Sequence, residues 1–221
     1  MTYVLIPGAG GAAYVWHRVE AELRARGHDA IAVQLPADDD EAGLADYADI
    51  VVAAAGAADD VVLAAQSMGA YSAALAARRL PVSTIVLVNP MIPLPGETAG
   101  EWWEATGHDE AIRESDRREG GPADGTFDDR FHFLHDVPPE LLPGLEASLR
   151  PQSGRPFADA VDTWPDVPVE MITGRDDRFF PAAFQRRLAR ERLGKVPVEL
   201  PGGHLLPLVR PAEVAGLLDA G

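Results

Sequence analysis

The chain has 221 residues, of which 47% are hydrophobic, and a formal net charge of −16 at pH 7. This length suits one α/β domain with a sizeable buried core, and the composition is unlike that of a disordered or fibrous chain. The negative charge argues against a nucleic-acid surface and against binding to anionic membranes, so we expect neither partner. The chain has no cysteine, which excludes disulfides, thiolate metal sites and a cysteine nucleophile.

The first residues and the apolar segments suggest where the protein works. Met1 leads directly into the apolar residues 2–6 with no basic segment before them, so the sequence predicts no signal peptide. No apolar stretch approaches the roughly 18 residues that a membrane span needs. We therefore expect a cytoplasmic protein, whose oligomeric state the sequence does not indicate.

Short apolar runs alternate with helical patterns along most of the chain, which is typical of a parallel sheet covered on both faces. The predicted strands are residues 3–7, 29–35, 61–64, 84–88, 169–173 and 197–200. The predicted helices are about 14–26, 44–57, 72–79 and 213–219, and Gly27 is placed to end the first of them. The sequence thus predicts an α/β fold with a mostly parallel central sheet between two layers of helices.

Between about residues 90 and 165 this alternation stops. The segment begins with a proline-rich stretch and contains Trp102, Trp103 and three of the six histidines, His108, His132 and His135. We interpret it as a short helical lid, inserted between consecutive strands of a single domain that spans residues 1–221. Active sites in open α/β folds lie at the carboxyl ends of the strands, so the lid is expected to fold over those ends.

The pentapeptide Ala65-Gln66-Ser67-Met68-Gly69 joins a predicted buried strand to a predicted helix. A serine on such a sharp turn has its hydroxyl lifted clear of the sheet, and the N–H of the next residue, Met68, points to where an oxyanion would form. Ala65 and Gly69 are small enough for this turn, although the usual pattern has glycine at both positions. Ser67 is therefore a candidate nucleophile, and a helix N-cap is its alternative role.

A serine nucleophile needs a base to accept its proton and a carboxylate to orient that base. Asp176 and Asp177 follow one predicted strand and a glycine turn, and His204 follows the last predicted strand. Because each residue lies just beyond a strand, these side chains can converge with Ser67 at one edge of the sheet. The aspartates could also belong only to a turn, and the histidine only to a loop. Their joint occurrence in the order Ser, Asp, His favours a catalytic triad.

The chain resembles the α/β-hydrolases, and among them the small-lid group that includes plant methyl-ester esterases and hydroxynitrile lyases. The resemblance runs nearly end to end and rests on four segments: residues 4–9 with Trp16, residues 66–69, residues 173–181, and Gly203-His204. In that family the acid lies three residues after the glycine and four before the proline, which implies Asp177 in place of Asp176.

The same resemblance implies that the N–H of Ala9 is the second oxyanion donor, beside that of Met68. The family carries His-Gly in this loop, whereas this chain has Pro7-Gly8. The departure removes a side chain that helps to order the loop but leaves the backbone donor in place. Trp102, Trp103 and His132 are candidate residues of the substrate pocket, with packing of the lid as their alternative role.

The implied activity is hydrolysis of small, fairly apolar carboxylic esters through an acyl-enzyme at Ser67, with no cofactor and no metal. Lactones, thioesters or carbon–carbon bonds would be cleaved by the same triad. A protein with this fold that only binds a ligand is a further alternative, because the fold alone does not settle function.

Particular residues argue against three other functions: a hydroxynitrile lyase, a dinucleotide-binding oxidoreductase and a metal site. Hydroxynitrile lyases place a lysine after the catalytic histidine, where this chain has Leu205. Gly8, Gly10 and Ala13 match a dinucleotide-binding pattern, but Gln34 and Leu35 stand where an NAD(P)-dependent oxidoreductase needs an acid. The acidic residues 38–41 have no histidine nearby and cannot all face one ion, so we expect a solvated loop and helix N-terminus there.

Overall fold

The computed structural model describes residues 1–220 of the chain. In this part of the chain one six-stranded sheet has the order β2-β1-β3-β4-β5-β6, and every neighbouring pair is parallel. The strands are β1 (Thr2–Ile6), β2 (Asp29–Ala32), β3 (Val61–Gln66), β4 (Val82–Val88), β5 (Val169–Gly174) and β6 (Val198–Leu200). The predicted parallel sheet between helices is confirmed.

Helices connect the strands and cover the sheet. Before β4 they are η1 (Ala13–Trp16), α1 (His17–Ala25), α2 (Leu44–Ala55) and α3 (Gly69–Ala76). Between β4 and β5 they are α4 (Ala99–Thr106), α5 (His108–Glu119), α6 (Asp129–His132), η2 (Pro139–Leu141), α7 (Leu142–Ser148) and η3 (Arg155–Ala158). After β5 they are α8 (Ala182–Leu188), η4 (Ala189–Leu193), α9 (Leu206–Val209) and α10 (Pro211–Asp219).

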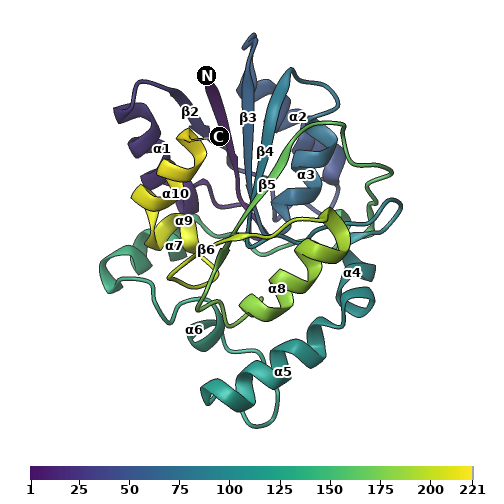
Figure 1. Cartoon of the computed structure of the whole chain (residues 1–221), viewed down its shortest axis with the longest axis vertical. Helices are drawn as coiled ribbons and strands as arrows, with labels where there is room; N and C mark the ends of the chain where they lie inside the picture. The colour runs from purple at the N-terminus through teal and green to yellow at the C-terminus, as the bar shows by residue number, and fades with distance from the viewer. Residues whose placement is uncertain (221) are drawn as a thin grey trace.

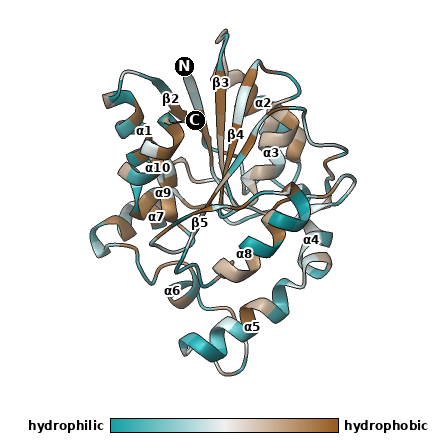
Figure 2. Ribbon diagram, viewed as in Figure 1, coloured by the Kyte–Doolittle hydropathy of each residue, from teal (hydrophilic) through white to brown (hydrophobic). Residues whose placement is uncertain are grey.

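Alternation along the strands creates two hydrophobic cores, one on each face of the sheet. In β1 the side chains of Val4 and Ile6 join one core, and those of Tyr3 and Leu5 join the other. Helices α2, α3 and α8 cover the first face, and α1, α9 and α10 cover the second (Figure 1). The strands are mostly apolar while the outer helix α5 is largely hydrophilic (Figure 2). The sheet is therefore buried on both faces and supports the residues that lie at its edge.

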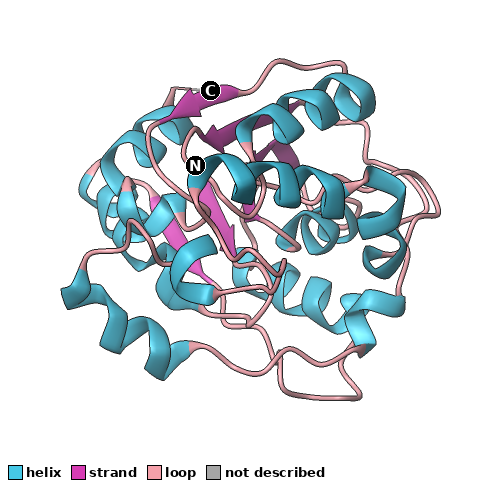
Figure 3. Ribbon diagram, turned by 90° about the horizontal axis from the view of Figure 1, so that it is seen from below, coloured by secondary structure: helices cyan, strands magenta, loops and turns pink. Residues whose placement is uncertain are grey.

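All strands run in the same direction, so their carboxyl ends meet at one edge. The segment between β4 and β5, with helices α4 to α7, lies beyond this edge (Figure 1). Seen from below, helices and loops lie in front of the strands and around them (Figure 3). Helix α4 begins where Thr98 and Glu101 exchange hydrogen bonds as a capping box, with Oγ1 accepting from the Glu101 N–H at 3.1 Å.

Several predicted bounds differ from the structure for local reasons. The helix predicted at 14–26 begins as the 3₁₀ turn η1, because the Trp16 indole is turned inward and donates to the Ile6 carbonyl at 3.0 Å. The strand predicted at 29–35 ends at Ala32. The helix predicted at 72–79 begins at Gly69, directly after the Ser67 turn. The acidic residues 38–41 form an exposed turn. In the described chain, none of the helices combines the length and the apolar character that crossing a bilayer requires.

Candidate active site

Ser67 lies in the turn between β3 and α3 with a φ of 54°, in the left-handed region that non-glycine residues rarely adopt. Its N–H donates to the Val88 carbonyl at 3.1 Å, which ties the turn to the end of β4. A Cβ atom at Gly69 would lie 2.6 Å from the Pro7 carbonyl oxygen, and one at Gly8 would lie 2.8 Å from Ser67 Cβ. Both glycines are therefore required by the close approach of the loop after β1 to the turn, whereas Ala65 fits within β3.

Asp177 and His204 form a buried pair beside this turn. The Nδ1 atom of His204 lies 2.8 Å from Asp177 Oδ2, and the two side chains are 3% and 0% exposed. The other carboxylate oxygen accepts the N–H groups of Phe179 at 2.9 Å and Phe180 at 2.8 Å. With its carboxylate fixed in this way, Asp177 holds the imidazole as the tautomer that carries its proton on Nδ1, which leaves Nε2 free to act as a base.

Ser67 and His204 line the same cavity, whose volume is about 870 Å³. Ala9 and Met68 line it as well, so the structure brings the predicted nucleophile, base and oxyanion donors together around one space. Much of the remaining wall is apolar and includes Val15, Met91, Trp103, Phe127, Phe133, Phe157 and Phe179. Such a wall favours an apolar ligand.

Three aromatic rings surround His204. The ring centroids of Phe133, Phe179 and Phe180 lie 5.1, 5.2 and 4.9 Å from that of the imidazole. Phe133 belongs to the segment between β4 and β5, and the other two follow Asp177 in the chain. These rings shield the Asp177–His204 pair from water, which strengthens electrostatic interactions within it.

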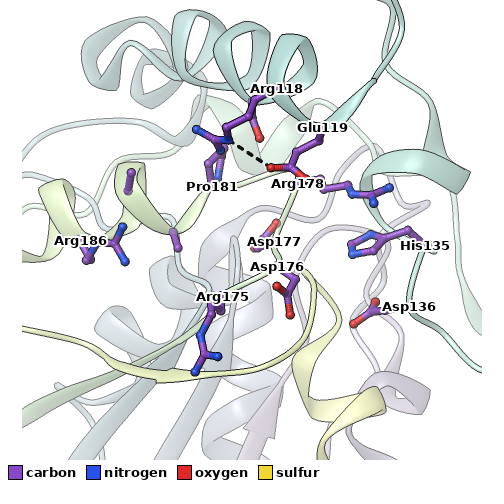
Figure 4. Close-up of a pocket in the computed structure, with 13 residues that line it drawn as sticks. Arg118, Glu119, His135, Asp136, Arg175, Asp176, Asp177, Arg178, Pro181 and Arg186 are labelled. Carbon is purple, nitrogen blue, oxygen red and sulfur yellow. Dashed lines mark hydrogen bonds and ion pairs between the residues drawn. The ribbon is translucent and has the colours of Figure 1, made fainter.

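Asp176 has a different hydrogen-bond partner from Asp177. It is exposed, and its Oδ2 atom accepts the N–H of Gly202 at 2.9 Å. Asp136 accepts the next N–H, that of Gly203, at 2.6 Å. Figure 4 shows both carboxylates below Asp177 in a second cavity, of about 510 Å³, whose lining carries charges of both signs. These two aspartates therefore hold the loop that carries the histidine.

Asn89 and Gln66 also hold this loop, and the sequence did not reveal their roles. Asn89 is fully buried and donates through Nδ2 to the carbonyls of Gly203 at 3.1 Å and His204 at 3.0 Å. Its Oδ1 atom accepts the N–H of Gly174 at 2.7 Å, which joins the end of β5 to the same point. Gln66 adds a bond from Nε2 to the His204 carbonyl at 3.3 Å. The sequence feature that could have indicated Asn89 is its position directly after a predicted strand, since asparagine tolerates the positive φ of 43° found there.

The loop after β1 presents the second predicted oxyanion donor. Gly8 donates its N–H to Gln66 Oε1 at 3.1 Å, so the residue before the nucleophile orders the loop in which Pro7 provides no N–H. Within residues 1–220, the N–H groups of Ala9 and Met68 have no protein acceptor. Both are therefore available to a ligand in the cavity, as an oxyanion hole requires.

Of the three residues expected in the substrate pocket, Trp103 lines the cavity and the other two do not. Trp102 is fully buried against the core, where its indole donates to the Ile92 carbonyl at 3.1 Å. His132 is also fully buried, with Nε2 3.0 Å from Asp116 Oδ1. The expectation of a pocket role is thus wrong for Trp102 and His132, because the sequence does not tell which side of a lid helix packs inward.

Two relatives match part of the chain. The Probable esterase PIR7A of Oryza sativa subsp. indica is 37% identical over 110 residues, a match that covers 44% of this chain and 42% of that protein. Methylesterase 7 of Arabidopsis thaliana is 38% identical over 104 residues, or 41% of this chain and 40% of that protein. The chain thus spans less than half the length of either relative in these matches, and the resemblance to this esterase group is confirmed.

The structure also resembles solved structures over its whole length. That of polyneuridine aldehyde esterase has a TM-score of 0.81 and 23% identity, and the match covers 99% of this chain and 98% of the other. At this identity the similarity concerns the fold. A sequence model of the alpha/beta hydrolase family matches residues 3–217, which is nearly the whole chain. The chain therefore belongs to the alpha/beta hydrolase family.

Proposed function

We propose that this protein is a serine hydrolase that cleaves small, fairly apolar carboxylic esters through an acyl-enzyme at Ser67. The observation that carries the proposal is the buried His204–Asp177 pair, joined at 2.8 Å, whose histidine lines one cavity with Ser67, a serine on a strained turn. The relatives that are named esterases support ester cleavage. In this proposal residues 1–221 form a single domain, and residues 90–165 form its lid.

The reaction begins when His204 Nε2 removes the proton from Ser67 Oγ as that oxygen attacks the ester carbonyl. The N–H groups of Ala9 and Met68 donate to the oxyanion of the tetrahedral intermediate, and Asp177 stabilises the charged imidazolium. Collapse of the intermediate breaks the bond to the alcohol oxygen, which takes the proton from His204. Water then attacks the acyl-enzyme with His204 again as the base. Collapse of this second intermediate breaks the bond to Ser67 Oγ, which takes the proton back from His204 as the carboxylic acid leaves.

The effects of the oxyanion donors and of the triad aspartate on the rate are known from similar sites in other enzymes. One oxyanion donor typically lowers the barrier by about 3 kcal/mol. Replacing the triad aspartate by asparagine typically lowers the rate on the order of 10⁴-fold, because the histidine then adopts the wrong tautomer. The backbone donors and the Asp177–His204 pair are therefore both needed for an efficient hydrolase.

The proposed partner is a small-molecule ester whose apolar part contacts the aromatic wall of the cavity. Trp103, Phe133 and Phe157 present large apolar surfaces to this space, and burial of apolar ligand area stabilises the complex. The cytoplasm is the proposed location, and fractionation of cells that produce the protein tests it.

Hydrolysis of short-chain p-nitrophenyl esters tests the proposed function. The purified protein should release p-nitrophenol, whereas Ser67→Ala should lower kcat by at least about 10³-fold, because the attacking oxygen is lost. Urea denaturation of both proteins serves as the control that the fold is retained. An alanine variant with full activity, or a wild-type protein without activity on a panel of esters and thioesters, would contradict the proposal.

A further inference from the structure

Two glutamine side chains hold the loop that carries Ala9, one on each side of that residue. The N–H of Gly8 donates to Gln66 Oε1 at 3.1 Å, and the N–H of Gly10 donates to Gln152 Oε1 at 2.9 Å. These N–H groups belong to the peptide units immediately before and after the Gly8–Ala9 unit. That middle unit carries the Ala9 N–H, which has no protein acceptor among residues 1–220. The carbonyl of this middle unit accepts the Gly11 N–H at 3.1 Å, so the orientation of the free N–H is set by that bond together with the two fixed units on either side.

Gln152 comes from the segment between β4 and β5, at a separation of 142 residues from Gly10. The other end of its amide is also held, because Nε2 donates to the Tyr47 hydroxyl at 3.3 Å and to the Ser153 carbonyl at 3.2 Å. Tyr47 is buried on α2, and burial raises the pKa of its hydroxyl, which therefore stays protonated. With Nε2 engaged on this side, Oε1 faces the Gly10 N–H.

The backbone around Gln152 is held without help from its side chain. The N–H of Arg150 donates to the Gly10 carbonyl at 3.1 Å, and the N–H of Ser153 donates to the Ala37 carbonyl at 2.7 Å. Gly10 has a φ of +81°, and a Cβ atom there would lie 2.8 Å from Leu149 Cδ2, so the two segments are in close contact. Replacing the side chain at position 152 should therefore leave the path of the chain intact.

We propose that Gln152 is a positioning residue of the oxyanion hole, which acts through Gly10 to aim the Ala9 N–H into the cavity. This inference rests on the proposed function, because it assigns a role within the same reaction. Gln152 accepts the Gly10 N–H and, together with the Gly11 N–H that donates to the Gly8 carbonyl, keeps the preceding Gly8–Ala9 peptide unit from rotating. It has no part in proton transfer, and its effect is on the transition state, in which the oxyanion carries the charge.

Loss of the acceptor should lower kcat more than it changes KM. A misaimed oxyanion donor stabilises the transition state less, whereas the neutral ester carbonyl of the ground state depends little on it. Because a donor that moves by a fraction of an ångström keeps part of its effect, we expect kcat to fall about tenfold to 100-fold. KM should change by less than about threefold, as for an interaction made only in the transition state.

The experiment compares three variants with the wild type in hydrolysis of a p-nitrophenyl ester. Gln152→Met has a similar length and only a weakly accepting sulfur. Gln152→Glu keeps a strong acceptor at the same reach, to which the Tyr47 hydroxyl can also donate, but it loses the bond that Nε2 donates to the Ser153 carbonyl. Gln34→Met is the matched control, because Gln34 Oε1 likewise accepts a backbone N–H, that of Ala13 at 3.1 Å, but at the exposed surface away from the cavity. Binding of an aryl trifluoromethyl ketone, which forms an oxyanion adduct with a serine, gives a second readout.

We expect Gln152→Met to lose kcat and ketone affinity by similar factors, Gln152→Glu to recover part of both, and Gln34→Met to match the wild type. Unchanged kcat in Gln152→Met, a change confined to KM, or a Gln152→Glu variant as impaired as Gln152→Met would each overturn the positioning role. Those results leave the proposed function standing, provided that the wild type is active and Ser67→Ala is not. An inactive wild type would overturn both.

Discussion

Asp176 and Asp177 are adjacent in the chain but hold different partners. Asp177 is buried and contacts His204, whereas Asp176 is exposed and accepts the N–H of Gly202. Successive side chains of this turn thus point to different sides, which a spacing of one residue cannot reveal. Only the resemblance to a known family distinguished the two carboxylates before the structure did.

Asparagine at each position separates the two roles. Asp177→Asn should lower kcat for ester hydrolysis on the order of 10³- to 10⁴-fold, because the amide no longer fixes the working tautomer of His204. Asp176→Asn keeps an oxygen that accepts the Gly202 N–H, so its kcat should fall by less than about tenfold. Steady-state kinetics of both variants on one ester provide the comparison, and the reverse ranking would move the catalytic role to Asp176.

The residues that short motifs reveal are those whose partners are implied by local context. Ser67 and His204 each follow a strand and a sharp turn, so the sequence predicts them directly. Asn89 and Gln152 act on atoms that are distant in the chain, at separations of 115 residues from His204 and 142 residues from Gly10. No local pattern records such contacts, and only the folded chain shows them.

Helices α8 and α9 cover the sheet but were not predicted from the sequence, whereas the strands and helices α1, α2, α3 and α10 could be predicted from their apolar residues. The helices between β4 and β5 could not. Helix α5 buries only His108, Ser115 and Asp116, so its sequence resembles that of a solvated segment. Helix α6 has four residues, too few for any period to be detected. Helix α5 contacts the loop after β5 through His108, and α6 contacts α5 through His132 and Asp116, whereas α4 and α7 bury Trp102 and Leu145 in the two cores.

One such contact, made by His108 of helix α5, makes the stability of the protein depend on pH. His108, at its first turn, is buried among aromatic rings, and its Nε2 lies 2.9 Å from the carbonyl of Phe179, in the loop that follows Asp177. Burial lowers the pKa of His108 below its usual value of 6.5. As the pH falls below about 6.5, the unfolded chain therefore binds a proton that the folded chain does not, and stability is lost.

His108→Gln tests this contact, because glutamine can still donate to the Phe179 carbonyl but does not titrate. Between pH 5 and 7 the free energy of unfolding of the wild type should decrease more steeply toward acid than that of the variant, by at most about 1.4 kcal/mol per pH unit. Urea denaturation of both proteins at several pH values measures the difference. Parallel pH profiles would show that His108 titrates alike in the folded and unfolded chains.

At the scale of the whole molecule, the segment between β4 and β5 contacts three loops of the site. Gln152 bonds the loop after β1, His108 bonds the loop after β5, and Asp136 bonds the loop after β6. The sheet brings the carboxyl ends of its strands to one edge, and this segment then fixes the loops that extend from them (Figure 1). This segment thus contacts the loops of the proposed catalytic groups and also lines part of the cavity.

If Ser67 is an activated nucleophile, it should react with a serine-directed fluorophosphonate. Mass spectrometry of the treated and digested protein should find one adduct, on the peptide that contains Ser67. The adduct should be absent from Ser67→Ala and should form at least about 100-fold more slowly in His204→Ala, because the base is missing. An adduct on a different residue, or equally fast labelling of the Ser67→Ala variant, would show that Ser67 is not the nucleophile.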